Sequence, residues 1–415
     1  MRISEKDLIK LIQAVQRKEI TAKKASLLSG HCYDHFIRVK EQYELKGASC
    51  FVHGLCGKRS NHSLPRKTVN KILKLYHKFF QEESIAVFYE ELNDTYNIKI
   101  SYTGLIRILS RNNIKSIYSF RKHKNPEHLI RPRRQYEGEL VQLDATPYKW
   151  FSRMGDTSYY TLHGAIDDAT SKITALYMTE NECTYGYFAC MQQMAERGEL
   201  PASVYTDRAG IFTKNPKVSM TIEEQIEWEK KEKTPTQWQR MCADLSIKQI
   251  LAHSPQAKGR VERMWRTIQG RLPFWIKKNN ISSVEELNSR IQEFIDYHNE
   301  KFAKAPYKSF KAFRSTPSNI HLILSAQEEK KVISGGIIRF KGLRLKLNEK
   351  ARVNDKVILY INNNGLYSAI NGVFHEVSIL NDYWSISDHA SESLQKIIYE
   401  YMYKDMKERD LTLTA

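Results

Sequence analysis

The apolar positions along the chain change their spacing twice, and these changes predict a multidomain protein. Up to about residue 115 the apolar residues recur every three or four positions, which predicts short amphipathic helices. Over residues 138–300 short apolar runs alternate with helical stripes, which predicts a central α/β domain. Over residues 331–380 apolar and polar residues alternate between glycine-containing turns, so we expect a small C-terminal β-barrel. Residues 301–330 are expected to be a linker, and residues 381–415 a helical tail.

The all-α N-terminal part begins with a predicted helix-turn-helix domain, residues 1–46. Its first helix follows the N-cap residue Ser4, its second covers Thr21–Leu28, and its third covers about Tyr33–Leu45. A short helix, a turn with glycine and a longer basic helix are typical of helix-turn-helix DNA-binding domains. We therefore expect Arg38 and Lys40 of the third helix to contact DNA.

A second helix-turn-helix domain is predicted over residues 65–115, after a polar linker at residues 47–64. Its third helix, Ser101–Arg111, is the second candidate recognition helix, with Arg107 at the DNA. A basic linker, residues 116–137, follows, and its extended composition suits contacts with phosphates, although a solvated tether is the alternative. The linker cations assigned to DNA are Arg121, Lys122, Arg131, Arg133 and Arg134.

Two cysteines and two histidines in and beside the first linker raise the question of a zinc site. Cys50, His53 and Cys56 have a spacing that zinc ligands can use, and His62 follows. Apolar residues lie between them, however, and no second ligand pair follows at finger-like spacing. We favour a short apolar connector over a zinc site.

The central domain, residues 138–300 with a charged insert at 214–233, has predicted elements in the order β-β-β-α-β-α-β-α. This order is that of a ribonuclease-H-like fold. Two predicted strands each run into a carboxylate, Asp144 and Asp207. A third acid, Glu262, lies near the start of a long helical pattern that begins at Gly259 and continues to about residue 278.

Structural roles are the alternative for each acidic residue of this domain. Lys258, Glu262 and Arg266 are four residues apart and share a helix face, which by itself is typical of a solvated, ion-paired surface. Asp167 and Asp168 fall between two predicted strands of a hairpin, so we assign them to the turn.

Three carboxylates gathered at one place favour a metal site, because they repel one another unless a cation lies between them. Mg²⁺ prefers oxygen ligands, and two Mg²⁺ ions about 3.5–4 Å apart can activate an attacking oxygen and stabilise a leaving oxygen in phosphoryl transfer. We therefore predict that Asp144, Asp207 and Glu262 form a catalytic site for two Mg²⁺ ions, with Mn²⁺ as an alternative.

The charge of the chain indicates a polyanionic partner. The 415 residues carry a net charge of +18 at pH 7, and nucleic acid is the first candidate, ahead of an anionic membrane surface. The sequence lacks a long apolar span and an N-terminal signal peptide, and its six cysteines fit reduced thiols. We expect a soluble intracellular protein in a bacterial-type or nuclear compartment.

Several segments together resemble the DDE transposases of bacterial insertion sequences, in particular the ISNCY group within the retroviral-integrase-like superfamily. They are LVQLDATPYKWF, AIDDAT, YTDRAGIF and AHSPQAKGRVERMWRTIQGRL in the core, AKKASLLSG and GASCFVHGLCGKRSN before it, and YHNEKFAKAP after it. The resemblance covers roughly residues 1–345, and it implies a cytoplasmic protein associated with the bacterial nucleoid. The separation between the second and third acids is longer here than in integrases, and the insert at 214–233 accounts for most of the difference.

The resemblance implies that Asp144, Asp207 and Glu262 are the metal-binding triad and that Lys258 and Arg263 contact DNA beside it. Arg208 and Arg266 complete the predicted DNA contacts. The expected partners are the element's terminal inverted repeats and target DNA, bound by a homodimer or a higher oligomer. The expected reaction is hydrolysis at the 3′ ends followed by joining of the 3′-OH to target DNA.

Two other functions remain as alternatives. A non-catalytic DNA-binding regulator derived from a transposase would keep the fold, but simple DNA binding does not require carboxylates that face phosphates. A ribonuclease-H-type nuclease would use similar acids, but the paired helix-turn-helix domains disfavour it.

Overall fold

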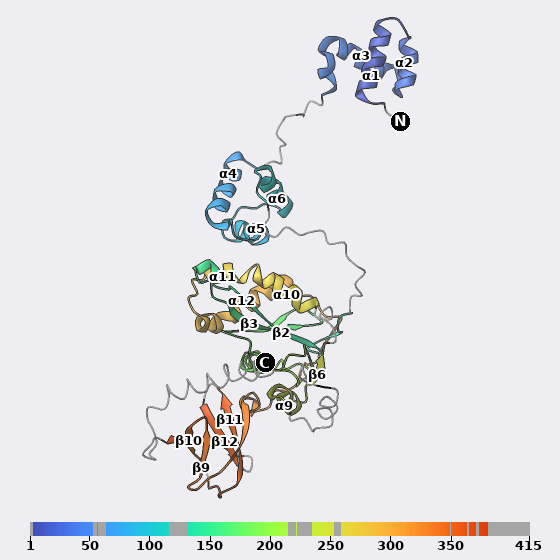
Figure 1. Cartoon of the computed structure of the whole chain (residues 1–415). Helices are drawn as coiled ribbons and strands as arrows, with labels where there is room; N and C mark the ends of the chain where they lie inside the picture. Colours follow the sequence, from blue (N-terminus) through green and yellow to red (C-terminus); the bar gives the residue numbers. More distant parts are fainter. Residues whose placement is uncertain are drawn as a thin grey trace. The chain divides into compact units, whose positions relative to one another are not determined.

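The computed structural model describes residues 3–52, 56, 64–115, 132–214, 221, 235–252, 259–348, 350–362, 365–370 and 373–380. The predicted contacts Arg121, Lys122, Arg131 and Lys258, most of the charged insert and the predicted tail lie outside these residues. The chain divides into two compact units, Met1–Phe79 and Phe80–Ala415, and each is described by itself. Figure 1 shows the helices and strands of the chain, coloured along the sequence. The boundary falls inside the predicted second helical domain, residues 65–115.

The first unit begins with the three predicted helices. They are α1 (Glu5–Gln16), α2 (Ala22–Ser29) and α3 (Tyr33–Lys46), followed by the 3-10 helix η1 (Gly47–Phe51), by α4 (Arg66–Leu75) and by the π-helical turn η2 (Tyr76–Phe80). Ser4 caps α1 as predicted, because its side chain accepts the N–H of Asp7. Gly30 ends α2 with φ at 71°, which glycine adopts without strain. The apolar stripes of α1–α3 meet in a small core that contains Ile12 and Phe36.

The central sheet has five strands in the order β4-β3-β2-β5-β6. The strands are β2 (Val141–Tyr148), β3 (Tyr160–Asp167), β4 (Ile173–Thr179), β5 (Ser203–Thr206) and β6 (Lys248–Leu251). Strands β2, β3 and β4 are antiparallel, whereas β5 pairs in parallel with both β2 and β6. Within the described residues the predicted order of strands and helices is present.

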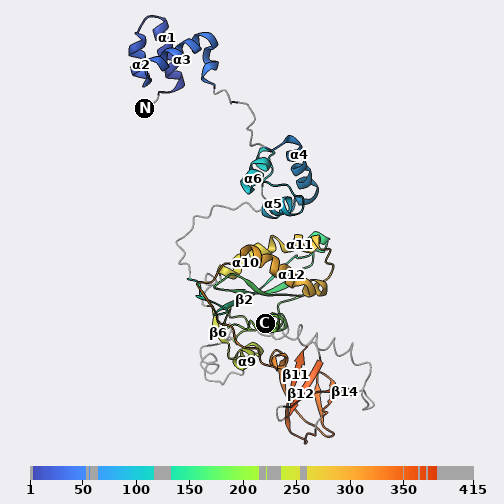
Figure 2. The same ribbon diagram turned by 180° about the vertical axis from the view of Figure 1, so that it is seen from behind.

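Helices cover both faces of this sheet (Figure 2). One face packs on α7 (Thr184–Glu196) and α9 (Gln237–Asp244). The other face packs on α10 (Gly259–Gln269), α11 (Leu272–Lys278) and α12 (Val284–Phe302). The prediction of one helix from residue 259 to about residue 278 is wrong, because Gly270 and Pro273 interrupt it and α11 starts anew.

The predicted strand end at Asp144 is also wrong. Strand β2 continues to Tyr148 because β3 pairs with it over its whole length, up to Tyr148–Tyr160. Pairing with β5 stops earlier, at Gln142–Tyr205. Asp144 therefore lies inside β2, just beyond the point where β2 and β5 separate.

The predicted closed β-barrel is not present among the described residues. The C-terminal strands form two antiparallel sheets, β14-β10-β9 and β13-β12-β11-β8. Their bounds are β8 (Ala326–Lys331), β9 (Ile337–Phe340), β10 (Leu343–Lys346), β11 (Lys356–Asn362), β12 (Gly365–Ile370), β13 (Val373–Glu376) and β14 (Ser378–Leu380). The two sheets share one apolar core, in which Phe340 and Leu345 of one sheet join Leu359 and Leu366 of the other. Burial therefore comes from two layers rather than from one closed sheet.

Short elements complete the second unit. They are α5 (Ile85–Asp94), α6 (Tyr102–Arg111), β1 (Tyr136–Glu137), η3 (Ser152–Met154), β7 (Lys308–Lys311) and α13 (Ile320–Ile323). Strand β7 lies in the predicted linker and pairs in parallel with β1. None of the helices that the structure describes is long and apolar enough to cross a membrane.

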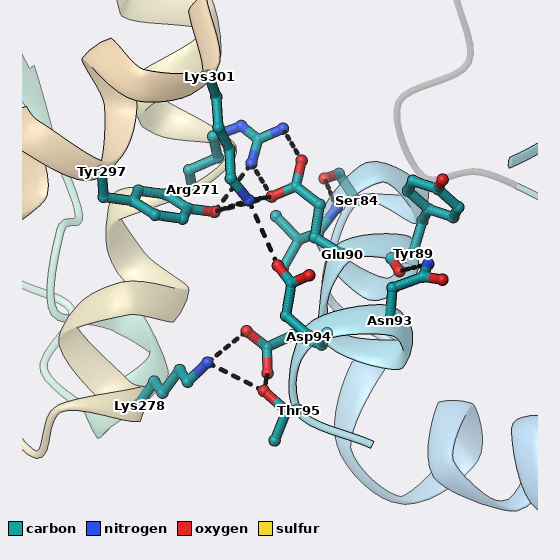
Figure 3. Close-up of polar contacts among 12 residues, drawn as sticks. Ser84, Tyr89, Glu90, Asn93, Asp94, Thr95, Arg271, Lys278, Tyr297 and Lys301 are labelled. Atoms are coloured by element: carbon teal, nitrogen blue, oxygen red, sulfur yellow. Dashed lines mark hydrogen bonds and ion pairs between the residues drawn. The ribbon is translucent and has the colours of Figure 1, made fainter. Parts of the chain in front are cut away.

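Helix α5 is fixed to the helices of the central domain by a polar cluster around Glu90 (Figure 3). The Arg271 guanidinium donates to both carboxylate oxygens of Glu90, at 2.7 and 2.8 Å. Lys301 and the hydroxyl of Tyr297 each donate to Oε2 at 2.8 Å. Burial acts to raise the pKa of Glu90, but the hydrogen bonds and charges of Arg271 and Lys301 outweigh it and lower the pKa to about 2.

Further ion pairs and a ring contact join residues 80–91 to the central domain. Arg153 donates to Glu83 at 2.7 Å, and Lys278 donates to Glu91 at 2.6 Å. The rings of Phe80 and Phe274 lie 5.5 Å apart. An acidic surface on residues 82–94 therefore faces a basic surface on the central domain.

Candidate active site

Asp144 is half-buried on β2 and is bonded to helix α10. Its Oδ2 accepts a hydrogen bond from the indole N–H of Trp265 at 3.0 Å. Gly164 pairs with Asp144 on β3 and leaves room for the indole, since a Cβ at this position would lie 2.6 Å from Trp265. The Asp144 side chain therefore lies on the sheet face that α10 covers.

Asp207 follows β5 directly and is half-buried. Its Oδ1 accepts the backbone N–H of Ala209 at 2.9 Å, which fixes the turn after the strand. The last paired residues of the two strands are Gln142 and Tyr205, so Asp144 and Asp207 are each two residues beyond that pair. Neighbouring strands are about 4.8 Å apart, so the two acids lie on adjacent strands, just beyond the point where β2 and β5 separate.

The charges of both aspartates affect the pKa of Tyr187, a buried tyrosine on α7. Burial raises the pKa of Tyr187 well above its ordinary value, and the charges of Glu182, Asp144 and Asp207 raise it further. The Tyr187 hydroxyl donates to Glu182 at 2.7 Å. Asp144 and Asp207 are therefore both within electrostatic range of one buried hydroxyl.

Glu262 is exposed in the first turn of α10. It precedes Trp265 by three residues, so one helical turn separates its side chain from the indole that binds Asp144. The buried face of α10 consists of Val261, Met264, Trp265 and Ile268. The bond from Trp265 to Asp144 thus fixes the helix that carries Glu262 against the strand that carries Asp144.

The three acids have the oxygen ligands that Mg²⁺ prefers, and two of them lie on the adjacent strands β2 and β5 where these separate. Across the parts of the chain that the structure describes, however, no group of three or more His, Cys, Asp or Glu side chains is placed to hold a metal ion. The chemistry of the donors fits a divalent cation, and the three-acid metal site stays a prediction.

The cations predicted beside the acids are exposed where they can be described. Arg263 and Arg266 lie on the exposed side of α10, and the Arg263 guanidinium bonds to the carbonyl of Gly259 at 3.1 Å. Arg208 is exposed directly after Asp207. These positions are compatible with DNA contacts, which stay predictions.

Two cations of the basic linker bind within the chain. Arg133 donates to the backbone carbonyl of Ala169 at 2.9 Å, and Arg134 donates to Glu139 at 3.3 Å. Both side chains join the end of the linker to the central domain, which gives them a structural role. Their contacts with DNA stay predictions.

The predicted DNA contacts of the helical parts lie on α3 and α6. Arg38 and Arg107 are exposed, and Lys40 forms an ion pair with Glu44 at 2.9 Å on its own helix. Cys50 and Cys56 are free thiols, and His53 and His62 lie outside the described residues. The preference for an apolar connector over a zinc site stays a prediction.

Several residues at this site were missed by the sequence interpretation. Trp265 had a usable signal, since it follows Glu262 by one helical turn. Gln142 also had one, because it is a polar residue inside the apolar run LVQLD. Arg260 and Asp168 had none, since their ion pair joins residues that are far apart in the sequence.

Comparisons with known proteins agree on one class of enzyme. The chain is 30% identical over 362 residues to the transposase for insertion sequence IS1202 of Streptococcus pneumoniae, with 80% of this chain and 75% of that protein covered. It is 26% identical over 364 residues to the y4bF protein of Sinorhizobium fredii, also described as a transposase. That match covers 86% of this chain and 76% of the y4bF protein. No protein-family model matches the chain.

Solved structures give weaker similarity. The simian T-cell lymphotropic virus intasome in complex with a PP2A regulatory subunit matches at 13% identity and a TM-score of 0.32, over 76% of this chain and 97% of that one. The HTLV-2 integrase catalytic core domain in complex with magnesium matches at 17% identity and a TM-score of 0.29, over 41% of this chain and 92% of that one. The assignment rests on the sequence relatives: this chain is an enzyme that belongs to the family of insertion-sequence transposases that includes the IS1202 transposase.

Proposed function

We propose that this transposase binds the terminal inverted repeats of its element, hydrolyses the phosphodiester bond at each 3′ end and joins the freed 3′-OH to target DNA. The observation that carries the proposal is that Asp144 and Asp207 lie on adjacent strands just beyond their last paired residues, with Trp265 of α10 bonded to Asp144. The sequence motifs around these residues support placement in the ISNCY group.

Asp144, Asp207 and Glu262 would hold two Mg²⁺ ions, with Mn²⁺ as an alternative. When bound, the ions activate the attacking oxygen and stabilise the negative charge on the leaving oxygen. Trp265 orients Asp144 by its hydrogen bond. The exposed cations Arg208, Arg263 and Arg266 would attract the DNA phosphates around the acids.

The two proposed steps involve the same element end but break different phosphodiester bonds. In the first step water attacks phosphorus and the bond to the 3′ oxygen breaks, which leaves a 3′-OH on the element and a 5′-phosphate on the flanking strand. In the second step this 3′-OH attacks a target phosphorus, and a 3′ oxygen of the target strand leaves. Because two element ends must reach one target, we propose a homodimer or a higher oligomer assembled on DNA.

End cleavage with labelled inverted-repeat DNA tests this function. We expect Asp144→Asn, Asp207→Asn and Glu262→Gln each to lose cleavage and joining by at least about a hundredfold, because each removes a charged ligand. Binding to the ends should persist and should weaken with added salt. The control is Glu285→Gln, an exposed acid on α12.

Two results would contradict the proposal. Unchanged cleavage by the triad variants would remove these residues from the chemistry. A wild-type protein that binds the ends but never nicks them, with any divalent metal, would instead support a non-catalytic regulator.

A further inference from the structure

The geometry points to Asp168 as a positioning residue, which sets the first turn of α10 against β2 and so sets Glu262 relative to Asp144. This inference rests on the proposed function, because it treats Asp144 and Glu262 as parts of one metal site. Sequence reasoning assigned Asp168 only to a hairpin turn. Its hydrogen bonds reach much further than that turn.

The Asp168 carboxylate is completely buried and accepts hydrogen bonds from several parts of the chain. Its Oδ1 accepts from the side-chain amide of Gln142 at 2.8 Å and from the Arg260 guanidinium at 2.7 Å. Its Oδ2 accepts the backbone N–H of Arg134 at 2.8 Å. These donors belong to β2, to α10 and to the segment that leads into β1, so one carboxylate joins three parts of the chain.

Two of these donors lie next to the proposed metal ligands. Gln142 is two residues before Asp144 on β2, and Arg260 is two residues before Glu262 on α10. The side-chain oxygen Oε1 of Gln142 also accepts the backbone N–H of Val261 at 3.4 Å. Gln142 therefore bridges Asp168 and the start of α10, where backbone N–H groups have no partner within the helix.

The ion pair between Arg260 and Asp168 is shielded from water. Only 11% of the Arg260 side chain and none of the Asp168 side chain is exposed. A buried pair of this kind tolerates the loss of one partner poorly, because an uncompensated charge is left behind. The pair therefore holds α10 in one position more firmly than an exposed ion pair would.

The neighbouring acid, Asp167, stabilises the hairpin turn, which is the role that the sequence predicted for Asp167 and Asp168 alike. It accepts hydrogen bonds from the backbone N–H of Gly138, and from the backbone N–H and hydroxyl of Thr170. It is equally buried, but none of these bonds reaches α10. Asp167 therefore offers a matched control for Asp168, with the same burial, the same chemistry and no link to Glu262.

The test compares Asp168→Asn with Asp167→Asn by two measurements. The first is the affinity of the full-length protein for Mn²⁺ without DNA, from electron paramagnetic resonance of the free ion. The second is the Mg²⁺ concentration that gives half-maximal end cleavage. For Asp168→Asn we expect Mn²⁺ binding about 10- to 100-fold weaker, as is typical when a group that orients a metal ligand is lost, and a matching rise in the Mg²⁺ requirement.

Asp167→Asn should lower the melting temperature yet leave the Mn²⁺ affinity within about twofold of wild type. Arg260→Gln provides a second variant if Asp168→Asn does not fold, and it should weaken Mn²⁺ binding in the same way. Arg260→Lys, which keeps the charge, should recover part of the affinity.

Equal metal affinity in Asp168→Asn, Arg260→Gln and wild type would overturn the inference. So would equal weakening by Asp167→Asn, because Asp168 would then act only through general stability. Failure of the proposed function is distinguishable, since Asp144→Asn would then leave cleavage intact.

Discussion

The indole N–H of Trp265 donates to Oδ2 of Asp144 at 3.0 Å, and this bond joins the helix of Glu262 to the strand of Asp144. The indole lies against Gly164, whose missing side chain gives it space. The Trp265 bond acts together with the bonds of Gln142 and Asp168. The relative positions of the proposed ligands on β2 and α10 are therefore fixed by groups that would not themselves touch the metal.

Replacing Trp265 with phenylalanine should impair cleavage more than folding. The change removes one hydrogen bond to a carboxylate, worth about 1.5–3 kcal/mol, so we expect end cleavage to fall by about tenfold to a hundredfold. The phenylalanine ring should keep much of the apolar contact that Trp265 makes with the sheet at Gly164. Cleavage rates at saturating Mg²⁺, compared with melting temperatures, measure the effect. Trp275→Phe on α11, in the same apolar core, is the control and should keep its activity.

Replacing Gly164 with alanine should disturb the same contact from the other side. The added Cβ would lie 2.6 Å from Trp265 and 3.0 Å from Met264, in a packed core where neither ring nor helix can move easily. We expect the free energy of unfolding to fall by about 1–3 kcal/mol, with a loss of cleavage. Urea denaturation measures the first effect. Gly270→Ala is the control, since its nearest contact would be 3.6 Å; an equal loss there would rule out the steric explanation.

Five of the six cysteines should react with thiol reagents in two classes. Burial raises the pKa of Cys183 to about 11 and that of Cys242 to about 12, and Cys190 is completely buried. Cys32 and Cys56 are exposed. At pH 7–8 we therefore expect a maleimide to label Cys32 and Cys56 rapidly and the buried three only after unfolding. Mass spectrometry of labelled peptides checks this, and rapid labelling of Cys183 or Cys242 in the folded protein would contradict the packing of the central domain.

The sequence was most informative where structure depends on local patterns. The first three helices follow from the spacing of residues such as Ile12 and Phe36 and from the cap at Ser4. The strand and helix order of the central domain follows from its apolar runs. These features were predictable because each depends on residues within one turn or one strand.

Long-range pairing was not predictable in the same way. The extension of β2 beyond Asp144 depends on β3, and the break between α10 and α11 depends on the effect of Gly270 and Pro273 on a long apolar stripe. Whether C-terminal strands close into a barrel depends on pairing between their edges, which alternation of side chains does not specify. The contacts of Asp168 and Glu90 join residues that are distant along the chain.

Glu90 should make the attachment of α5 sensitive to acid. Its side chain is 19% exposed, and its pKa of about 2 in the folded protein lies below the ordinary value of 4.5. The folded state therefore gains stability above about pH 4.5, up to roughly 3 kcal/mol, and loses it as the pH falls from 4.5 towards 2. We expect Glu90→Gln to weaken the protection of α5 against hydrogen exchange at pH 7, with a difference from wild type that shrinks below pH 4.5.

Glu82→Gln is the control, because the Glu82 side chain is 72% exposed and its pair with Arg153 should contribute little. A pH-independent difference between Glu90→Gln and wild type would contradict the role of the carboxylate charge, and equal loss of protection in Glu82→Gln would show that no single acid dominates this contact.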